Sequence, residues 1–139
     1  MAASFSLSVV TPEKVFFDGE TSQIIVRTTE GDIGILANHT SLVADLPSGP
    51  LKVRQEDGGW RTAAISTGLL KVGGNKVSIL ANAVEWADEI DVEWAKRSEE
   101  DARRRLKEMQ HDKLEMDRAE LKLQRALNRI SVSSMTDNK

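Results

Sequence analysis

Glycine and proline occupy only one part of this chain. All nine glycines and all three prolines lie before residue 75, whereas residues 91–130 contain neither and are about half charged. Because Gly and Pro mark turns and strand ends, the first part is expected to consist of short strands joined by tight turns. A long segment that lacks both and is rich in Ala, Leu, Glu, Lys and Arg favours helix. The sequence therefore predicts a strand-rich part followed by a charged helical part.

Alternating hydrophobicity supports strands in the first part. Phe5, Leu7 and Val9 fall on one face and serines on the other, as in a half-buried strand. Further segments rich in Val, Ile or Thr are 14–17, 23–29, 33–36, 51–55, 61–66, 69–72 and 76–82. Hairpin-type turns at 57–58 and 73–75 pair 51–55 with 61–66 and 69–72 with 76–82. Short strands at such close spacing predict an antiparallel β-sandwich or flattened barrel.

Beyond residue 85 the hydrophobic pattern changes to a helical period. Two stripes lie on single helical faces, and they consist of Val92, Ala95, Ala102, Leu106 and Met109, and of Met116, Ala119, Leu123, Ala126 and Ile130. Residues 110–113 lack stripe positions and are expected to form a bend. The predicted fold is therefore α+β, with an N-terminal antiparallel β-sandwich (1–86) and a C-terminal two-helix antiparallel hairpin (87–139). Because the stripes are thin and rich in Ala, the hairpin should be only marginally stable.

Composition argues against an enzyme. The chain has no cysteine, and His39 and His111 are its only imidazoles, so no nucleophile, base and acid converge. His39 is expected to be a loop histidine bonded to backbone, and His111 lies at the predicted bend. The histidines are too far apart for a metal site, and no Gly-rich turn of the phosphate-loop type feeds a helix. We expect a non-catalytic protein with no metal and no cofactor.

The charge balance and hydropathy narrow the partners. Residues 91–130 carry eleven Lys or Arg against ten Asp or Glu, too even a balance for a typical nucleic-acid surface. No run approaches the roughly 20 apolar residues that cross a bilayer. The first ten residues lack the basic start and apolar stretch of a secretion signal. We therefore expect neither nucleic-acid binding nor a membrane span.

Basic residues form the most informative charged set in the helical part. One group is Arg103, Arg104 and Arg105, and another is Lys122, Arg125 and Arg129, which recur at three- and four-residue steps along one helical face. One interpretation is a solvated helix with i,i+4 ion pairs such as Glu100–Arg104, each contributing about 0.2–0.5 kcal/mol. The alternative is a basic stripe that meets an acidic helix of a partner protein.

Three separate motifs carry a family resemblance. They are Gly-Asp-Ile-Gly-Ile-Leu-Ala-Asn-His at 31–39, Ile-Ser-Thr-Gly-Leu-Leu-Lys-Val at 65–72, and Glu-Ile-Asp-Val-Glu at 89–93 followed by the helices that end Arg-Ala-Leu-Asn-Arg-Ile at 125–130. In this order, from about residue 4 to 132, the chain resembles the epsilon subunit of the proton-translocating F-type ATP synthase.

The resemblance implies a ten-stranded sandwich and a role in the rotor. The sandwich would bind the gamma subunit and the top of the c-subunit ring, at the cytoplasmic face of the bacterial cell membrane. The helices would alternate between a folded hairpin and an extended form that blocks ATP hydrolysis. In the extended form, Lys122, Arg125 and Arg129, and secondarily Arg103, Arg104 and Arg105, would contact an acidic segment of the catalytic beta subunits.

Some bacterial relatives in this family bind ATP on the folded hairpin. The matching positions in this chain are Ile90, Asp91, Ala95, Arg125 and Arg129. Trp94 and Asp101 stand where those relatives have arginines, and loss of two cations should weaken binding of a polyphosphate. The sequence therefore predicts weak or absent ATP binding. The alternative function, from another class, is a free nucleotide-binding sensor domain.

Overall fold

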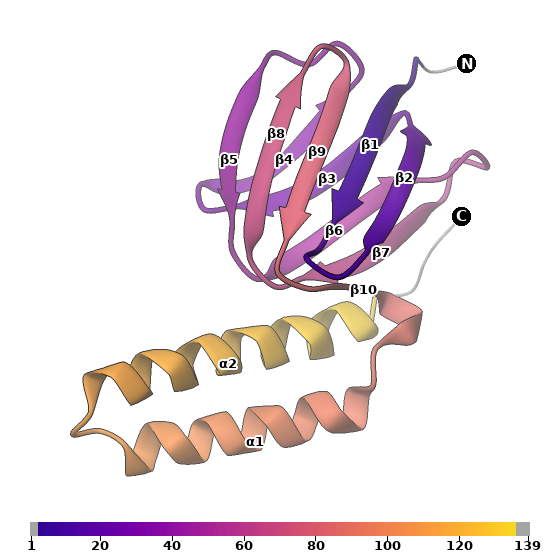
Figure 1. The fold of residues 1–139 in the computed structure, drawn as a ribbon. Helices are drawn as coiled ribbons and strands as arrows, with labels where there is room; N and C mark the ends of the chain where they lie inside the picture. The colour runs from indigo at the N-terminus through magenta and orange to yellow at the C-terminus, as the bar shows by residue number, and fades with distance from the viewer. Residues whose placement is uncertain (1–2, 136–139) are drawn as a thin grey trace.

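Two stacked β-sheets form the N-terminal part of the molecule. The computed structural model describes residues 3–135, and in this range ten strands precede the helices (Figure 1). The strands are β1 (Phe5–Val10), β2 (Val15–Thr21), β3 (Gln23–Thr28), β4 (Gly31–Leu36), β5 (Leu42–Leu46), β6 (Gly49–Arg54), β7 (Trp60–Ile65), β8 (Gly68–Gly73), β9 (Lys76–Ala81) and β10 (Val84–Trp86). The antiparallel sandwich that the sequence predicts is therefore confirmed, with the ten strands that the resemblance implies.

Each sheet contains five strands. One sheet has the order β2-β1-β9-β8-β5 and the other the order β10-β7-β6-β3-β4. All pairings are antiparallel except β1 with β9, which run parallel. The two hairpins predicted from turn residues are present, since β6 pairs with β7 and β8 pairs with β9. The strands β5 and β10 were not predicted from the sequence pattern.

The hydrophobic core lies between the two sheets. Alternate residues of β1 point inward, and Phe5, Leu7 and Val9 are almost fully buried, as the period-2 pattern predicts. The core cluster extends from Phe5 to Trp86 and contains no residue of the helices. The sandwich thus has a complete core of its own.

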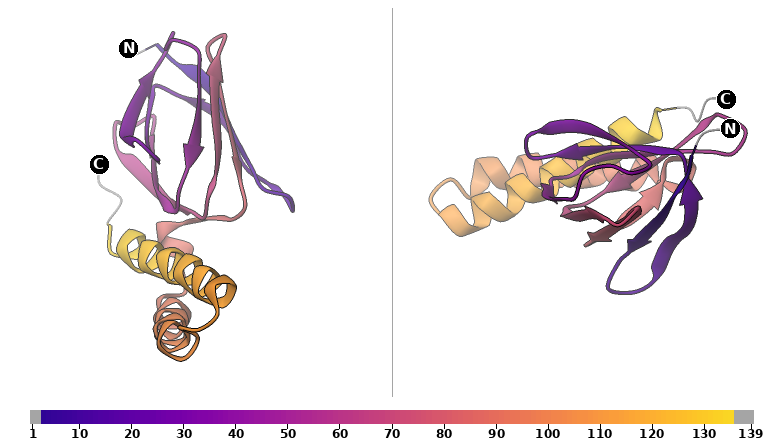
Figure 2. Two further views of the ribbon diagram at one scale, coloured as in Figure 1. Left: turned by 90° about the vertical axis from the view of Figure 1, so that its left-hand side faces the viewer. Right: turned by 90° about the horizontal axis from the view of Figure 1, so that it is seen from above.

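Two helices follow the sandwich and lie against one end of it (Figures 1 and 2). A short 3₁₀ turn (Ala87–Glu89) leads to α1 (Val92–Glu108), and α2 (Lys113–Ser133) returns antiparallel to it. The bend falls within 109–112, close to the predicted position. The main contacts with the sandwich come from α2, which touches β6, β7 and the 3₁₀ turn. A small second cluster of Ala64, Ala87, Ile90 and Val132 seals this junction.

Candidate functional site in the helical hairpin

Both helices begin at an aspartate cap. The Asp91 carboxylate accepts a hydrogen bond of 3.0 Å from the Trp94 backbone N–H. In the same way Asp112 accepts one of 3.2 Å from the Glu115 N–H. A carboxylate at this position satisfies a free N–H group and interacts favourably with the helix dipole. The sequence therefore starts α1 just after the sandwich and α2 just after the bend.

Small side chains line the contact between the helices. On α1 the buried residues are Ala95, Ser98 and Ala102, and those of α2 include Ala119, Leu123 and Ala126. Ser98 fills the gap in the stripe between Ala95 and Ala102, and its polarity hid it from the hydrophobic pattern. Such residues let the helices approach closely but bury little apolar area. Polar contacts between the helices therefore contribute a large share of the stability of the hairpin.

The predicted basic stripe of α2 faces inward in this structure. Lys122, Arg125 and Arg129 line a hollow of about 510 Å³ between the hairpin and the sandwich. Its other lining residues are Ser66, Asn82, Ala83, Trp94 and Ser98. The structure thus brings together the three cations proposed for a partner contact, and it places them on the folded face of α2.

Lys122 forms an ion pair that crosses from α2 to α1. Its Nζ lies 2.5 Å from Oδ2 of Asp101, whose side chain is only 23% exposed. Asp101 also contacts Arg104, and its Oδ2 lies 3.0 Å from Nε of Arg105. The hydrogen bond from Lys122, followed by the charges of Arg105, Lys122 and Arg104, lowers the pKa of Asp101 below its ordinary value. One carboxylate thus holds cations from both helices.

Arg129 connects α2 to the sandwich and to α1. Its Nε lies 2.5 Å from Oε1 of Glu85 in β10, and its side chain is only 19% exposed. The guanidinium also lies 4.9 Å from the centre of the Trp94 ring, in the arrangement of a cation–π contact. Trp94 and Asp101 are the two positions where the sequence departs from the ATP-binding pattern, and both contact the basic stripe.

Arg125 is the one member of the stripe with an unsatisfied atom. Its Nε is buried and has no hydrogen-bond partner within residues 3–135. Unsatisfied buried donors are uncommon in folded proteins, because each loses its bonds to water. Arg125 is also one of the residues that line the hollow.

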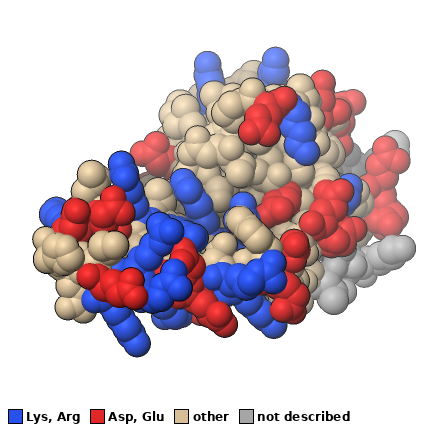
Figure 3. All heavy atoms as spheres, turned by 60° about the horizontal axis from the view of Figure 1, so that its bottom comes forward, with Lys and Arg blue, Asp and Glu red and all other residues tan. Residues whose placement is uncertain are grey.

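The arginines of α1 have a different environment. Arg103 pairs with Glu99 at 2.9 Å, and Arg104 is within 4.0 Å of Glu108 in addition to its contact with Asp101. All three arginines are at least half exposed. The sequence suggested an ion pair between Glu100 and Arg104, but Arg104 pairs with Asp101 and Glu108 instead. Acidic and basic side chains alternate over this face of the hairpin (Figure 3). Arg104 and Arg105 share the partner Asp101 with Lys122 of the basic stripe, whereas Arg103 pairs with Glu99 instead.

The remaining residues predicted for nucleotide binding have roles in the fold. Ile90 packs in the small cluster at the junction, Asp91 caps α1, and Ala95 is completely buried between the helices. His39 lies in a loop with its Nδ1 2.7 Å from the Thr40 carbonyl oxygen, as expected for a histidine bonded to backbone. Among residues 3–135 no three His, Asp or Glu side chains gather in a way that could hold a metal ion.

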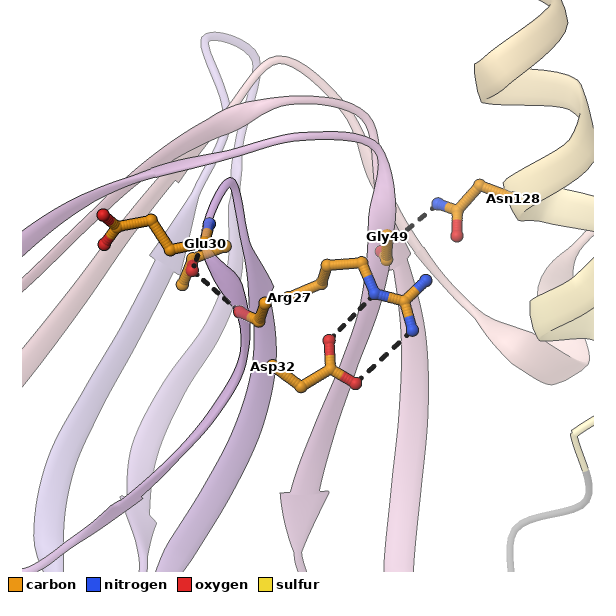
Figure 4. A network of polar contacts seen from close by, with 7 residues as sticks. Arg27, Glu30, Asp32, Gly49 and Asn128 are labelled. Atoms are coloured by element: carbon orange, nitrogen blue, oxygen red, sulfur yellow. Dashed lines mark hydrogen bonds and ion pairs between the residues drawn. The ribbon is translucent and has the colours of Figure 1, made fainter.

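Asn128 docks α2 on the sandwich and was missed by sequence reasoning. Its side-chain N–H₂ group donates to the carbonyl oxygens of Gly49 at 3.2 Å and Ile65 at 3.0 Å, which are paired across β6 and β7. Figure 4 shows Asn128 pointing from α2 toward Gly49, beside the ion pair of Arg27 and Asp32. The only signal in the sequence is a short amide side chain among longer residues on a helix.

We expect closure of the hairpin to be independent of pH across the neutral range. Because the pKa of Asp101 is lowered in the folded state, its pairing stabilises the hairpin above the ordinary aspartate value of about 3.9. This contribution is lost only as the pH falls through the lowered value. Thermal unfolding of the helices, followed by circular dichroism, should show no change from about pH 6 to 8. The variant Asp101→Asn should reduce the acid-side loss, and an opening midpoint near neutral pH would contradict Asp101 as its cause.

Fold and site together define a two-part protein, in which a closed sandwich carries a lightly attached helical hairpin with a basic inner face. The beta-sandwich domain of the ATP synthase delta/epsilon chain matches residues 4–87, and the long alpha-helix domain of the same chain matches residues 88–134. The protein belongs to this family of ATP synthase delta/epsilon chains.

Individual relatives cover almost the whole chain. The ATP synthase epsilon chain of Ruminococcus albus is 47% identical and spans 95% of this chain and 98% of its own length. That of Caldicellulosiruptor bescii is 45% identical, with 94% of both chains covered. A chain in the Euglena gracilis mitochondrial ATP synthase structure with OSCP, F1 and c-ring superposes with a TM-score of 0.80 at 26% identity, covering 92% of this chain and 80% of that chain. In the described part of the protein, neither helix has the length and apolar character that a membrane span requires.

Proposed function

We propose that this protein is a non-catalytic subunit of the central stalk of a proton-translocating ATP synthase, which links the rotor to the catalytic head and inhibits ATP hydrolysis through its helices. The observation that carries this proposal is the match of both halves, in order, to the two domains of one family. The protein would lie at the cytoplasmic face of the bacterial cell membrane, held there by the other subunits.

The surface proposed for the gamma subunit is an apolar row on the outside of one sheet. Val15, Val10, Leu80 and Leu69 are neighbours across β2, β1, β9 and β8. Leu80 is 54% exposed and Val15 62% exposed. A contiguous apolar row on a sheet is typical of a protein–protein interface. We call these four residues the outer row, and we propose that they contact the gamma subunit.

The end of the sandwich away from the helices is proposed to meet the c-ring. There the Asn38 N–H donates to Oδ1 of Asn75 at 2.8 Å, and Nδ2 of Asn75 donates to the Ser4 carbonyl oxygen at 3.1 Å. Both asparagines have positive φ, which Asn tolerates better than most residues. These bonds tie the β4–β5 and β8–β9 loops to the start of β1 and hold this end in one shape (Figure 1). A rigid end suits a lasting contact with another subunit.

The helical hairpin is proposed to act on the catalytic beta subunits. Its basic stripe has the spacing of a helix face that could pair with an acidic segment. In the folded hairpin the stripe is turned toward α1 and the sandwich, so contact with a partner requires the hairpin to open. The thin apolar contact between the helices makes that opening inexpensive in free energy.

Co-purification with the gamma subunit tests the proposed function. The full chain and gamma, expressed together, should elute from gel filtration as a one-to-one complex. Addition of the full chain to a head complex that lacks its own copy should lower the rate of ATP hydrolysis. Failure of both results would overturn a stalk function for this protein.

We further propose that the hollow beside the stripe binds ATP weakly or not at all. Asp101 and Glu85 already pair with Lys122 and Arg129, so a polyphosphate would have to displace two carboxylates. Isothermal titration calorimetry should give a Kd weaker than about 1 mM. The variant Asp101→Arg should bind ATP more tightly than Asp101→Asn, because it adds a cation beside the hollow. Micromolar binding by the native chain would instead support the nucleotide sensor.

A further inference from the structure

We infer that Asp101 and Glu85 form an internal latch that holds the hairpin closed by occupying the cations of its own basic stripe. The latch consists of two ion pairs, Asp101 with Lys122 and Glu85 with Arg129. The existence of the latch follows from contacts within this chain. Its regulatory meaning rests on the proposed function.

Asp101 is held in place to receive Lys122. Arg104 and Arg105 come from the same helix as Asp101 and orient its carboxylate, whereas Lys122 comes from the opposite helix. The Lys122 pair is thus the contact of Asp101 that must break when the helices separate. With the Asp101 side chain 23% exposed and the Lys122 side chain 38% exposed, this pair is less screened by water than an ordinary surface pair.

Glu85 provides the second point of the latch, from the sandwich. It belongs to β10, whose residues Val84 and Trp86 are anchored in the core, so its position is fixed by the sheet. Its partner Arg129 is more buried than any other charged member of an ion pair in the described residues, at 19% exposure. The first pair thus joins α1 to α2, and the second joins α2 to the sandwich. In both pairs the cation belongs to α2.

The latch and a partner compete for the same groups. Lys122 and Arg129 cannot present their charges to an external acidic segment while they pair with Asp101 and Glu85. The two carboxylates therefore act as an internal substitute for the acidic partner. Because the apolar contact is thin, breaking these pairs should shift the balance between closed and open hairpins measurably.

Distance measurements on the full chain test the latch directly. The chain has no cysteine, so spin labels attach only at introduced Lys96→Cys and Ser131→Cys, which lie near the start of α1 and the end of α2, the two ends that separate when the hairpin opens. Double electron–electron resonance should show a second distance for open molecules. We expect Asp101→Asn and Glu85→Gln each to raise the open fraction about fivefold. At about 1 M salt the native chain should approach a variant that carries both Asp101→Asn and Glu85→Gln, because the Debye length falls to about 3 Å.

Glu99→Gln is the matched control. It removes one carboxylate of similar exposure from the same helix, but among residues 3–135 the ion-pair partner of Glu99 is Arg103, within α1 itself. Its open fraction should stay close to that of the native chain. If Asp101→Asn opens the hairpin no more than Glu99→Gln does, the latch is wrong.

ATP hydrolysis by the head complex separates the latch from the proposed function. Asp101→Asn should inhibit more strongly than the native chain, because it frees Lys122. Lys122→Met should open the hairpin to a similar extent but should inhibit less than Asp101→Asn does, because it also removes the cation. Opening without any change in hydrolysis would support the latch and contradict the inhibitory role.

Discussion

A chain that ends at Ala87 should bind the rotor as well as the full chain does, but it should no longer inhibit ATP hydrolysis. The hydrophobic core lies within the sandwich, from Phe5 to Trp86, and the outer row lies on β1, β2, β8 and β9. Truncation therefore removes neither the core nor the proposed gamma surface. It removes the whole basic stripe, so inhibition should fall several-fold, to the level without added chain.

The measurement compares hydrolysis by a head complex that lacks this subunit, after addition of full or truncated chain. Gel filtration with gamma in the same experiment shows whether the truncated chain still docks. Circular dichroism controls for folding, and it should show the strand signal without the helical one. Equal inhibition by the two chains would exclude the helices as the inhibitory element, whereas loss of gamma binding would show that the hairpin takes part in docking.

The division of this fold was predictable because it depends on local rules. Turn residues with Gly or Asn set the hairpins β6–β7 and β8–β9, and the absence of Gly and Pro after residue 75 marked the helices. β10 escaped prediction because three residues, Val84–Trp86, are too short to show alternation. Ser98 escaped because burial between two helices depends on size, and a serine is small enough to fit there despite its hydroxyl group.

The arrangement of the candidate site was less predictable, because its contacts are distant in sequence. The stripe of Lys122, Arg125 and Arg129 could be recognised from helical spacing. The carboxylates that pair with this stripe could not be predicted in the same way, since Asp101 is 21 residues from Lys122 and Glu85 is 44 residues from Arg129. These pairings depend on the register of one helix against the other and on how α2 lies against the sandwich, where it touches β6, β7 and the 3₁₀ turn. The sequence marked Asp101 as a departure from a pattern, and the structure shows what the carboxylate contacts.

Charges placed in the outer row should abolish binding to gamma. In a docked complex Leu69, which is 37% exposed, and Leu80, which is 54% exposed, would lose their remaining contact with water. That gain is about 0.6–1.6 kcal/mol for each side chain, the exposed fraction of the value for complete burial. The double variant Leu69→Glu and Leu80→Glu loses this gain and also forces two carboxylates into an apolar contact. We expect the affinity for gamma to fall by about 1000-fold or more. Surface plasmon resonance with immobilised gamma measures the change.

Leu36→Glu provides the control for this loss, because Leu36 is 58% exposed but lies on β4 in the opposite sheet. It introduces the same charge on a comparably exposed leucine, so its affinity for gamma should remain within about threefold of the native value. Neither substitution touches the core, since Leu70 and Ile79 carry the inward packing next to the outer row. The thermal unfolding midpoint should therefore change little in both variants. If the Leu69 and Leu80 variant binds as tightly as the Leu36 variant, the outer row is not the gamma surface, and the rotor contact must lie on another face of the sandwich.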